Sequence, residues 1–181
     1  MYMAIETRRW TLEEMHALPE DGNKYELIYG ELLVTPAPTN AHETIAARLS
    51  AILTPYVQTH RLGMVFHPRA VLRLGNRVEV EPDLMVRQPH PDPHGPWETA
   101  PMPILVVEVL SPSTRTHDVG SKRKVYIDEA RIAEYWIVDG DERTLTSFAP
   151  GRPDVVLRDQ VTWHPSGASE PLTFSAFDLV G

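Results

Sequence analysis

Cysteine is absent from all 181 residues of the sequence, which excludes disulfide bonds and thiolate metal sites. Long apolar runs are absent too, since none approaches the ~20 residues that a membrane-spanning helix needs. Residues 1–15 lack the apolar stretch of a secretory signal. We therefore expect a cytoplasmic protein that does not insert into membranes. The length and the lack of a boundary or repeat predict a single domain over residues 1–181.

The sequence contains fewer basic than acidic residues. The chain has 17 Lys and Arg against 25 Asp and Glu, a net charge of −8 with His neutral. This balance excludes affinity for nucleic acid through a global positive field. It does not exclude a nuclease, because a divalent metal offsets the charge of a carboxylate site. A local basic patch is one interpretation of the segment 115–131, and a solvated helix face is the other. Its basic residues are Arg115, Lys122, Arg123, Lys124 and Arg131.

The most informative stretch is the apolar run 104–110, which contains Glu108. A run rich in β-branched residues, closed by Ser-Pro, predicts a strand buried on both faces. An ionised carboxylate buried there costs several kcal/mol unless it has a partner. Glu108 is therefore expected to meet a cation, a hydrogen-bond network or an open cleft.

Two neighbouring motifs supply groups that Glu108 could meet. Downstream, Asp118, Lys122 and Tyr126 are spaced four residues apart, which places them on one face of a helix predicted over 118–131. Upstream, Asp83 ends another strand-like run. An Asp, a Glu and a Lys around two strand ends and a helix are the parts of a metal-dependent phosphodiesterase site. The simpler interpretations are an acidic solvent face around Asp83 and a surface pair of Lys122 with Asp118, worth about 0.2–0.5 kcal/mol.

The rest of the chain predicts a mixed sheet flanked by helices, an α/β class with an α+β mixed sheet. Asn40 is the expected N-cap of the second helix, and Pro55 is expected to kink it or end it early. The expected elements are a helix over 11–18 begun by a capping box, a hairpin over 24–34 around Tyr29-Gly30, a helix over 41–59, strands over 64–74 and 77–86 joined at Gly75-Asn76, a strand over 134–139, an antiparallel extension over 143–149 and 154–158, and a tail over 171–177 packed on the body.

Several other acidic or metal-binding side chains have two interpretations. Glu26 and Glu31 flank the hairpin turn, and exposed charge is favoured over a role in a site. Glu43 either faces the site or caps its helix. The Pro-rich segment 87–103 favours a flap or an oligomer contact over a metal site. The metal-ligand types within that segment are His90, Asp92 and His94.

These motifs resemble a known family. From residue 41 the predicted order is helix, three strands, helix and strand, which resembles the core of the PD-(D/E)XK nuclease superfamily. More closely, the chain resembles the Uma-type family of putative restriction endonucleases over about residues 10–150. The residues that carry the resemblance are Tyr25-Glu26-Leu27-Ile28, Gly30-Glu31, Pro82-Asp83, the run Val107 to Thr114, the spaced Asp118, Lys122 and Tyr126, and Glu134-Tyr135-Trp136.

The resemblance implies a restriction-endonuclease-like core with an N-terminal helix and hairpin and a C-terminal β extension. It implies a Mg²⁺- or Mn²⁺-dependent endonuclease that hydrolyses DNA phosphodiester bonds. Asp83 and Glu108, with the Val109 carbonyl, would hold the metal. The superfamily pattern places its lysine where this chain has Leu110, and the resemblance implies that Lys122 replaces it from the following helix.

Other expectations accompany this one. Tyr126 either orients Lys122 or packs against the sheet. Because endonucleases that cut duplexes are often dimers, we expect a homodimer. The alternative function is a catalytically inactive nuclease-fold module for binding or assembly, favoured by the acidic balance and the displaced lysine. A hydrolase of small phosphate esters has no dedicated phosphate loop to support it.

Overall fold

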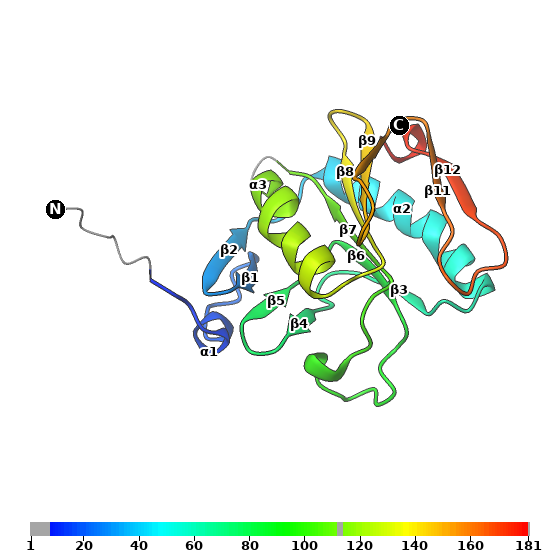
Figure 1. Cartoon of the computed structure of the whole chain (residues 1–181). Helices are drawn as coiled ribbons and strands as arrows, with labels where there is room; N and C mark the ends of the chain where they lie inside the picture. The colour runs from blue at the N-terminus through cyan, green and yellow to red at the C-terminus, as the bar shows by residue number, and fades with distance from the viewer. Residues whose placement is uncertain (1–7, 112–113, 181) are drawn as a thin grey trace.

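The computed structural model describes residues 8–111 and 114–180, so Pro112 and Ser113 of the motif lie outside it (Figure 1). In the first half of the chain the elements are α1 (Leu12–His16), β1 (Lys24–Ile28), β2 (Glu31–Thr35), α2 (Asn40–Thr59), β3 (Met64–Phe66), β4 (Leu72–Leu74), β5 (Val78–Val80), β6 (Leu84–Arg87) and the short 3₁₀ helix η1 (Trp97–Thr99). In the second half they are β7 (Leu105–Val109), α3 (Arg115–His117), the π-helical turns η2 (Asp118–Lys122) and η3 (Lys124–Glu129), β8 (Glu134–Asp139), β9 (Thr144–Phe148), β10 (Val155–Leu157), β11 (Gln160–Trp163), β12 (Leu172–Ser175) and α4 (Phe177–Val180).

A six-stranded sheet in the order β10-β9-β8-β7-β6-β3 forms the centre of the fold. Within it β7 and β8 are parallel, and the other neighbours are antiparallel. The connection from β7 to β8 is the continuous helix α3-η2-η3, which covers one face of the sheet, while α2 covers the other (Figure 1). The fold is thus the predicted α+β mixed sheet with helices against it.

The N-terminal hairpin joins a second, four-stranded sheet in the order β2-β1-β5-β4. Its turn residues Tyr29 and Gly30 have φ angles of 52° and 90°, as a tight two-residue hairpin requires. The capping box of Thr11 with Glu14 begins α1. The predicted helix and hairpin are both confirmed. One face of β1 packs on the side of the large sheet that α3-η2-η3 covers.

The two strands predicted over 64–74 and 77–86 are each divided in two. The outer halves, β3 and β6, pair in the six-stranded sheet, whereas the inner halves, β4 and β5, pair in the four-stranded sheet. Pro82 has no N–H to donate, so the ladder breaks beside it and the chain passes from one sheet to the other. The predicted turn at Gly75-Asn76 is confirmed as the link between β4 and β5.

The prediction for the long helix was wrong about its N-cap, and the helix does not end early at Pro55. Thr39 is the N-cap, because its side chain accepts the backbone N–H of His42, and Asn40 is already helical. The helix continues through Pro55 to Thr59. Pro55 and Ala51, whose carbonyl loses its helical partner, are both exposed, so water can satisfy that carbonyl.

The second half of the chain agrees with the prediction apart from its boundaries, two strands and one short helix. The helix predicted over 118–131 begins at Arg115 and ends at Glu129. The strand β8 has the predicted bounds, and β9 and β10 form the expected antiparallel extension. The strands β11 and β12, which pair with each other, and the helix α4 were missed. The tail over 171–177 packs on the body as expected, since Leu172, Phe174 and Ala176 join the core that contains α2, although Phe177 is 46% exposed. Over residues 8–111 and 114–180, no helix has both the length and the apolar character to cross a membrane.

Candidate active site

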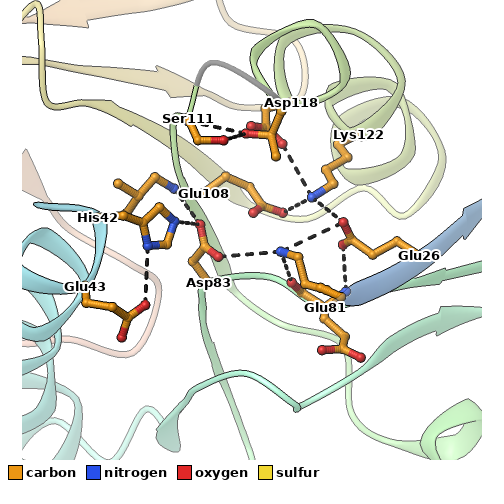
Figure 2. A network of polar contacts seen from close by, with 12 residues as sticks. Glu26, His42, Glu43, Glu81, Asp83, Glu108, Ser111, Asp118 and Lys122 are labelled. Carbon is orange, nitrogen blue, oxygen red and sulfur yellow. Dashed lines mark hydrogen bonds and ion pairs between the residues drawn. The ribbon is translucent and has the colours of Figure 1, made fainter. Parts of the chain in front are cut away.

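The register between β6 and β7 brings Asp83 and Glu108 together. Leu84 pairs with Val107, so the next step of the ladder places Asp83 opposite Glu108 on one face of the sheet. The Val109 N–H donates to Asp83 Oδ2 at 2.8 Å and fixes that carboxylate at the strand end. Both acidic residues are buried, with exposed fractions of 6% and 2%. Figure 2 draws both side chains among their neighbours.

The helix after β7 contributes Lys122 and Tyr126 to the same carboxylate. The Lys122 ammonium lies 3.0 Å from Glu108 Oε1, and the Tyr126 hydroxyl donates to that oxygen at 2.9 Å. Lys122 also lies 3.4 Å from Asp118 Oδ1, but only 1% of Lys122 is exposed. The interpretation as a surface ion pair is therefore wrong, and the helix presents Lys122 to the strand end as the resemblance implied (Figure 2).

Glu26 and Lys24 were missed. Both lie on the face of β1 that contacts this cluster, two residues apart. Glu26 is 1% exposed, its Oε1 accepts the Glu81 N–H at 2.9 Å, and its Oε2 lies 3.0 Å from the Lys122 ammonium. Glu26 was expected as exposed charge, which holds only for Glu31, whose side chain is 57% exposed. Parity alone could not single out this face of the strand, because Leu27 on the opposite face is as buried as Ile28 on the face of Glu26.

His42, rather than Glu43, is the residue of α2 that reaches the cluster. Its Nε2 lies 3.1 Å from Asp83 Oδ2. The Glu43 side chain is 62% exposed, and its carboxylate lies 3.4 Å from His42 Nδ1, on the side away from Asp83 (Figure 2). Glu43 therefore touches the site only through His42. The first turn of a helix carries both residues, and its rotation decides which one points inward.

The environment of the two central carboxyl groups shifts their pKa values in opposite directions. Burial alone would raise the pKa of Asp83, but the hydrogen bond from His42, the charge of Lys24 and the Val109 N–H lower it to about 2. Burial raises the pKa of Glu108 to about 8 despite the charge of Lys122, and the negative charge of Asp83 adds to the rise. The surroundings thus favour the ionised form of Asp83, whereas burial opposes the ionisation of Glu108.

Lys122 is held as a cation by its neighbours. Burial would lower its pKa, but the charges of Glu108, Glu26 and Asp118 raise that pKa well above its usual value. Among the described residues, four buried carboxyl groups surround two ammonium groups, so acid is in excess. These residues are Glu26, Asp83, Glu108 and Asp118 against Lys24 and Lys122.

Two hollows reach this cluster from the surface. A groove of about 610 Å³ runs along α2 and the segment 67–68 and ends at His42 and Asp83. A smaller cavity of about 120 Å³ beside β2 is lined by Glu26 and Lys122. The side chains of the cluster are therefore buried, but the two hollows lie directly beside some of them and are open to a ligand.

The oxygen donors of this cluster fit a Mg²⁺ ion that takes few of its ligands from the protein. In the ranges 8–111 and 114–180, no three His, Asp or Glu side chains converge closely enough to hold a metal by themselves. Mg²⁺, however, usually takes one or two carboxylates and keeps several waters. Asp83, which lines the groove, and Glu108, opposite it in the sheet, supply two hard oxygen donors, and the Val109 carbonyl stays a predicted third.

The segment 87–103 does not build a metal site of its own. His90 Nδ1 accepts the Asp92 N–H at 2.9 Å, and Asp92 Oδ1 accepts the His94 N–H at the same distance. These side chains thus bond to the backbone of their own loop. The loop is attached to the body by Trp97, whose ring lies 5.6 Å from the Arg87 guanidinium.

Comparisons with known proteins bear on the fold and the family of the chain. A solved structure, described as a putative nuclease belonging to DUF820 from Anabaena variabilis, superposes with a TM-score of 0.72 at 24% identity, covering 94% of this chain and 97% of that one. This similarity shows a common fold. No curated protein matches the chain. The profile of the family Uma2, described as "Putative restriction endonuclease", matches residues 12–176, which is most of the sequence, and the chain therefore belongs to the Uma2 family.

Proposed function

We propose that this protein is a Mg²⁺- or Mn²⁺-dependent endonuclease that hydrolyses phosphodiester bonds of DNA. The family membership supports a nuclease. The observation that carries the proposal is the meeting of Asp83, Glu108 and Lys122, three residues distant in sequence, beside a groove that Asp83 lines. A Mg²⁺ ion held by the two carboxylates would lower the pKa of a bound water and neutralise charge on the phosphate.

The chain's own residues would prepare this reaction in distinct ways. Asp83 is ionised and fixed by Val109 and His42, so it is a preorganised ligand. The raised pKa of Lys122 supports a role as a positive charge that stabilises the anionic transition state rather than as the base that deprotonates water. Tyr126 packs among apolar side chains against the sheet, which is one of its two expected roles. Its hydrogen bond would also orient Glu108.

Plasmid cleavage tests this function directly. We expect nicking or linearisation with Mg²⁺ or Mn²⁺ and none with EDTA. The variants Asp83→Ala, Glu108→Ala and Lys122→Ala should each lose activity by about 100-fold or more. Glu129→Ala is the matched control, because it removes a carboxylate from an exposed position at the end of η3 and should leave the rate within about twofold. Equal activity in all of these proteins would identify a contaminant and defeat the proposal.

The proposal includes a homodimer, because a duplex has two strands and the described residues form one such cluster. Light scattering at micromolar concentration should give twice the chain mass of 20.4 kDa. A monomeric mass would remove the dimer but leave single-strand nicking intact.

A binding or assembly module without catalysis is the second candidate. One observation favours it: Lys24 and Lys122 already neutralise part of the acidic cluster, so a metal is not the only possible counter-ion. Calorimetric titration with Mn²⁺ separates the two functions. Heat of binding that disappears in Asp83→Ala supports the nuclease, whereas its absence in the wild type supports the module.

A further inference from the structure

Lys24 is a cation of the cluster that the proposed reaction does not use. Its ammonium donates to the Glu81 carbonyl at 3.1 Å and lies 3.6 Å from Asp83 Oδ1 and 3.8 Å from Glu26 Oε2. Its side chain is 17% exposed, compared with 1% for Lys122. Lys24 is therefore attached more loosely than Lys122 and lies closer to solvent.

The two oxygens of Asp83 are not equally available. Oδ2 accepts from the Val109 N–H and faces His42 Nε2, so both of its lone pairs are directed to the protein. Oδ1 remains as the oxygen that an incoming metal could bind. Lys24 is the cation beside that oxygen.

We propose that Lys24 is a resident counter-ion that a divalent metal must displace from Asp83. This inference rests on the proposed metal-dependent function. A metal and an ammonium at the same oxygen repel each other, and a flexible four-carbon side chain at the edge of the cluster can move away. Lys122 stays, because it lies within 3.4 Å of three carboxylates and is enclosed.

The exchange has a structural use. Without a metal, Asp83 and Glu26 would face each other across a buried space with less neutralising charge, and Lys24 lies between them. With the metal bound, the same neutralisation comes from the ion. Lys24 thus lets the folded chain exist without metal, and it weakens metal binding because its displacement opposes binding.

Calorimetric titration of the full chain with MnCl₂ at pH 7.5 tests this exchange. Lys24→Met should bind Mn²⁺ about tenfold more tightly than the wild type, because the competing charge is gone. Lys24→Arg keeps the charge and should stay within about threefold of the wild type. Lys124→Met is the matched control: it removes the same charge from an exposed position of η3 and should change nothing. Circular dichroism verifies that each variant is folded.

A second measurement uses the wild type alone and does not depend on the folding of a variant. Acetylation by a water-soluble active ester, quantified by mass spectrometry, should label Lys24 several-fold faster when saturating Mn²⁺ is present. Lys122 should remain protected in both conditions. The faster labelling supports displacement.

The outcomes distinguish this inference from the proposed function. If Mn²⁺ binds the wild type and Lys24→Met equally, or the labelling rate of Lys24 does not change, the displacement is overturned and the nuclease stands. If neither folded protein binds Mn²⁺, the metal-dependent function is overturned and the displacement with it. Tighter Mn²⁺ binding by Lys24→Met, with Lys24→Arg and Lys124→Met near the wild type, supports both the displacement and the metal-dependent function.

Discussion

The two faces of β7 perform different tasks. Leu105, Val107 and Val109 point toward α2 and join a core of apolar side chains. On the opposite face Val106 packs with apolar neighbours, but Glu108 meets Lys122 in the buried ionic cluster. Adjacent residues of a single strand thus belong to an apolar interior and to an ionic one.

The contrast between the apolar and the ionic face of β7 indicates how this fold combines stability with a reactive site. Apolar burial contributes about 25 cal/mol per Å² without directional demands, so the α2 face can stabilise the sheet by area alone. The ionic face depends on geometry, because the attraction between buried charges offsets the cost of their desolvation only when they are paired and hydrogen-bonded. Substitutions on the α2 face should therefore change stability, whereas substitutions on the ionic face should change activity, and some of them stability too.

Lys122→Met should have the largest effect on stability. Loss of one partner from a buried ionic group leaves Glu26, Glu108 and Asp118 without their common cation, which costs about 3–5 kcal/mol. Urea unfolding in EDTA measures this loss, and cleavage assays should show lost activity as well. Lys124→Met, two residues along the same helix, should stay within about 0.5 kcal/mol of the wild type. Equal stability of the two variants would contradict a buried role for Lys122.

Leu53→Ala probes the apolar face. Leu53 is fully buried in the core between α2 and the sheet, so its truncation should cost about 3 kcal/mol through lost burial and a cavity. The folded protein should cleave plasmid at the wild-type rate per molecule at low temperature. A loss of cleavage larger than the unfolded fraction would show that the two faces are not independent.

The ionic face should also make stability depend on pH. The pKa of Glu108 is raised from 4.5 to about 8, so the folded state holds this proton where the unfolded chain has released it. Stability from this residue is therefore greatest below pH 4.5 and declines as the pH rises to about 8. The pKa of Asp83 is lowered from 3.8 to about 2, so its contribution has the opposite sign and disappears only as the pH falls through that range.

Glu108→Gln isolates the effect of Glu108. The amide keeps an oxygen for Lys122 and Tyr126 but cannot ionise. Urea unfolding between pH 4.5 and 8, with EDTA present, should give a smaller decline in unfolding free energy for the variant than for the wild type. Identical slopes would mean that Glu108 titrates normally in the folded protein.

The same comparison explains what the sequence could predict. Apolar periodicity located α2 and β7, and helical spacing placed Asp118, Lys122 and Tyr126 on one face, because each signal is local. Glu26 escaped because the side of a hairpin that packs inward is fixed by a distant partner, here the junction of β5 and β6. The division of the two long predicted strands escaped for the same reason, since the choice between sheets depends on tertiary pairing.

Asp154→Asn should have the smallest effect and marks where the ionic face ends. Asp154 pairs with Arg123, the residue after Lys122, but their side chains are 45% and 32% exposed. Water competes for an exposed pair, so the loss should be less than about 1 kcal/mol and should shrink further in high salt. Cleavage should be unchanged. Lys122 and Arg123 are neighbours in one helix. A large loss of stability in Asp154→Asn would therefore mean that charged residues of this helix stabilise the fold whether or not they are buried.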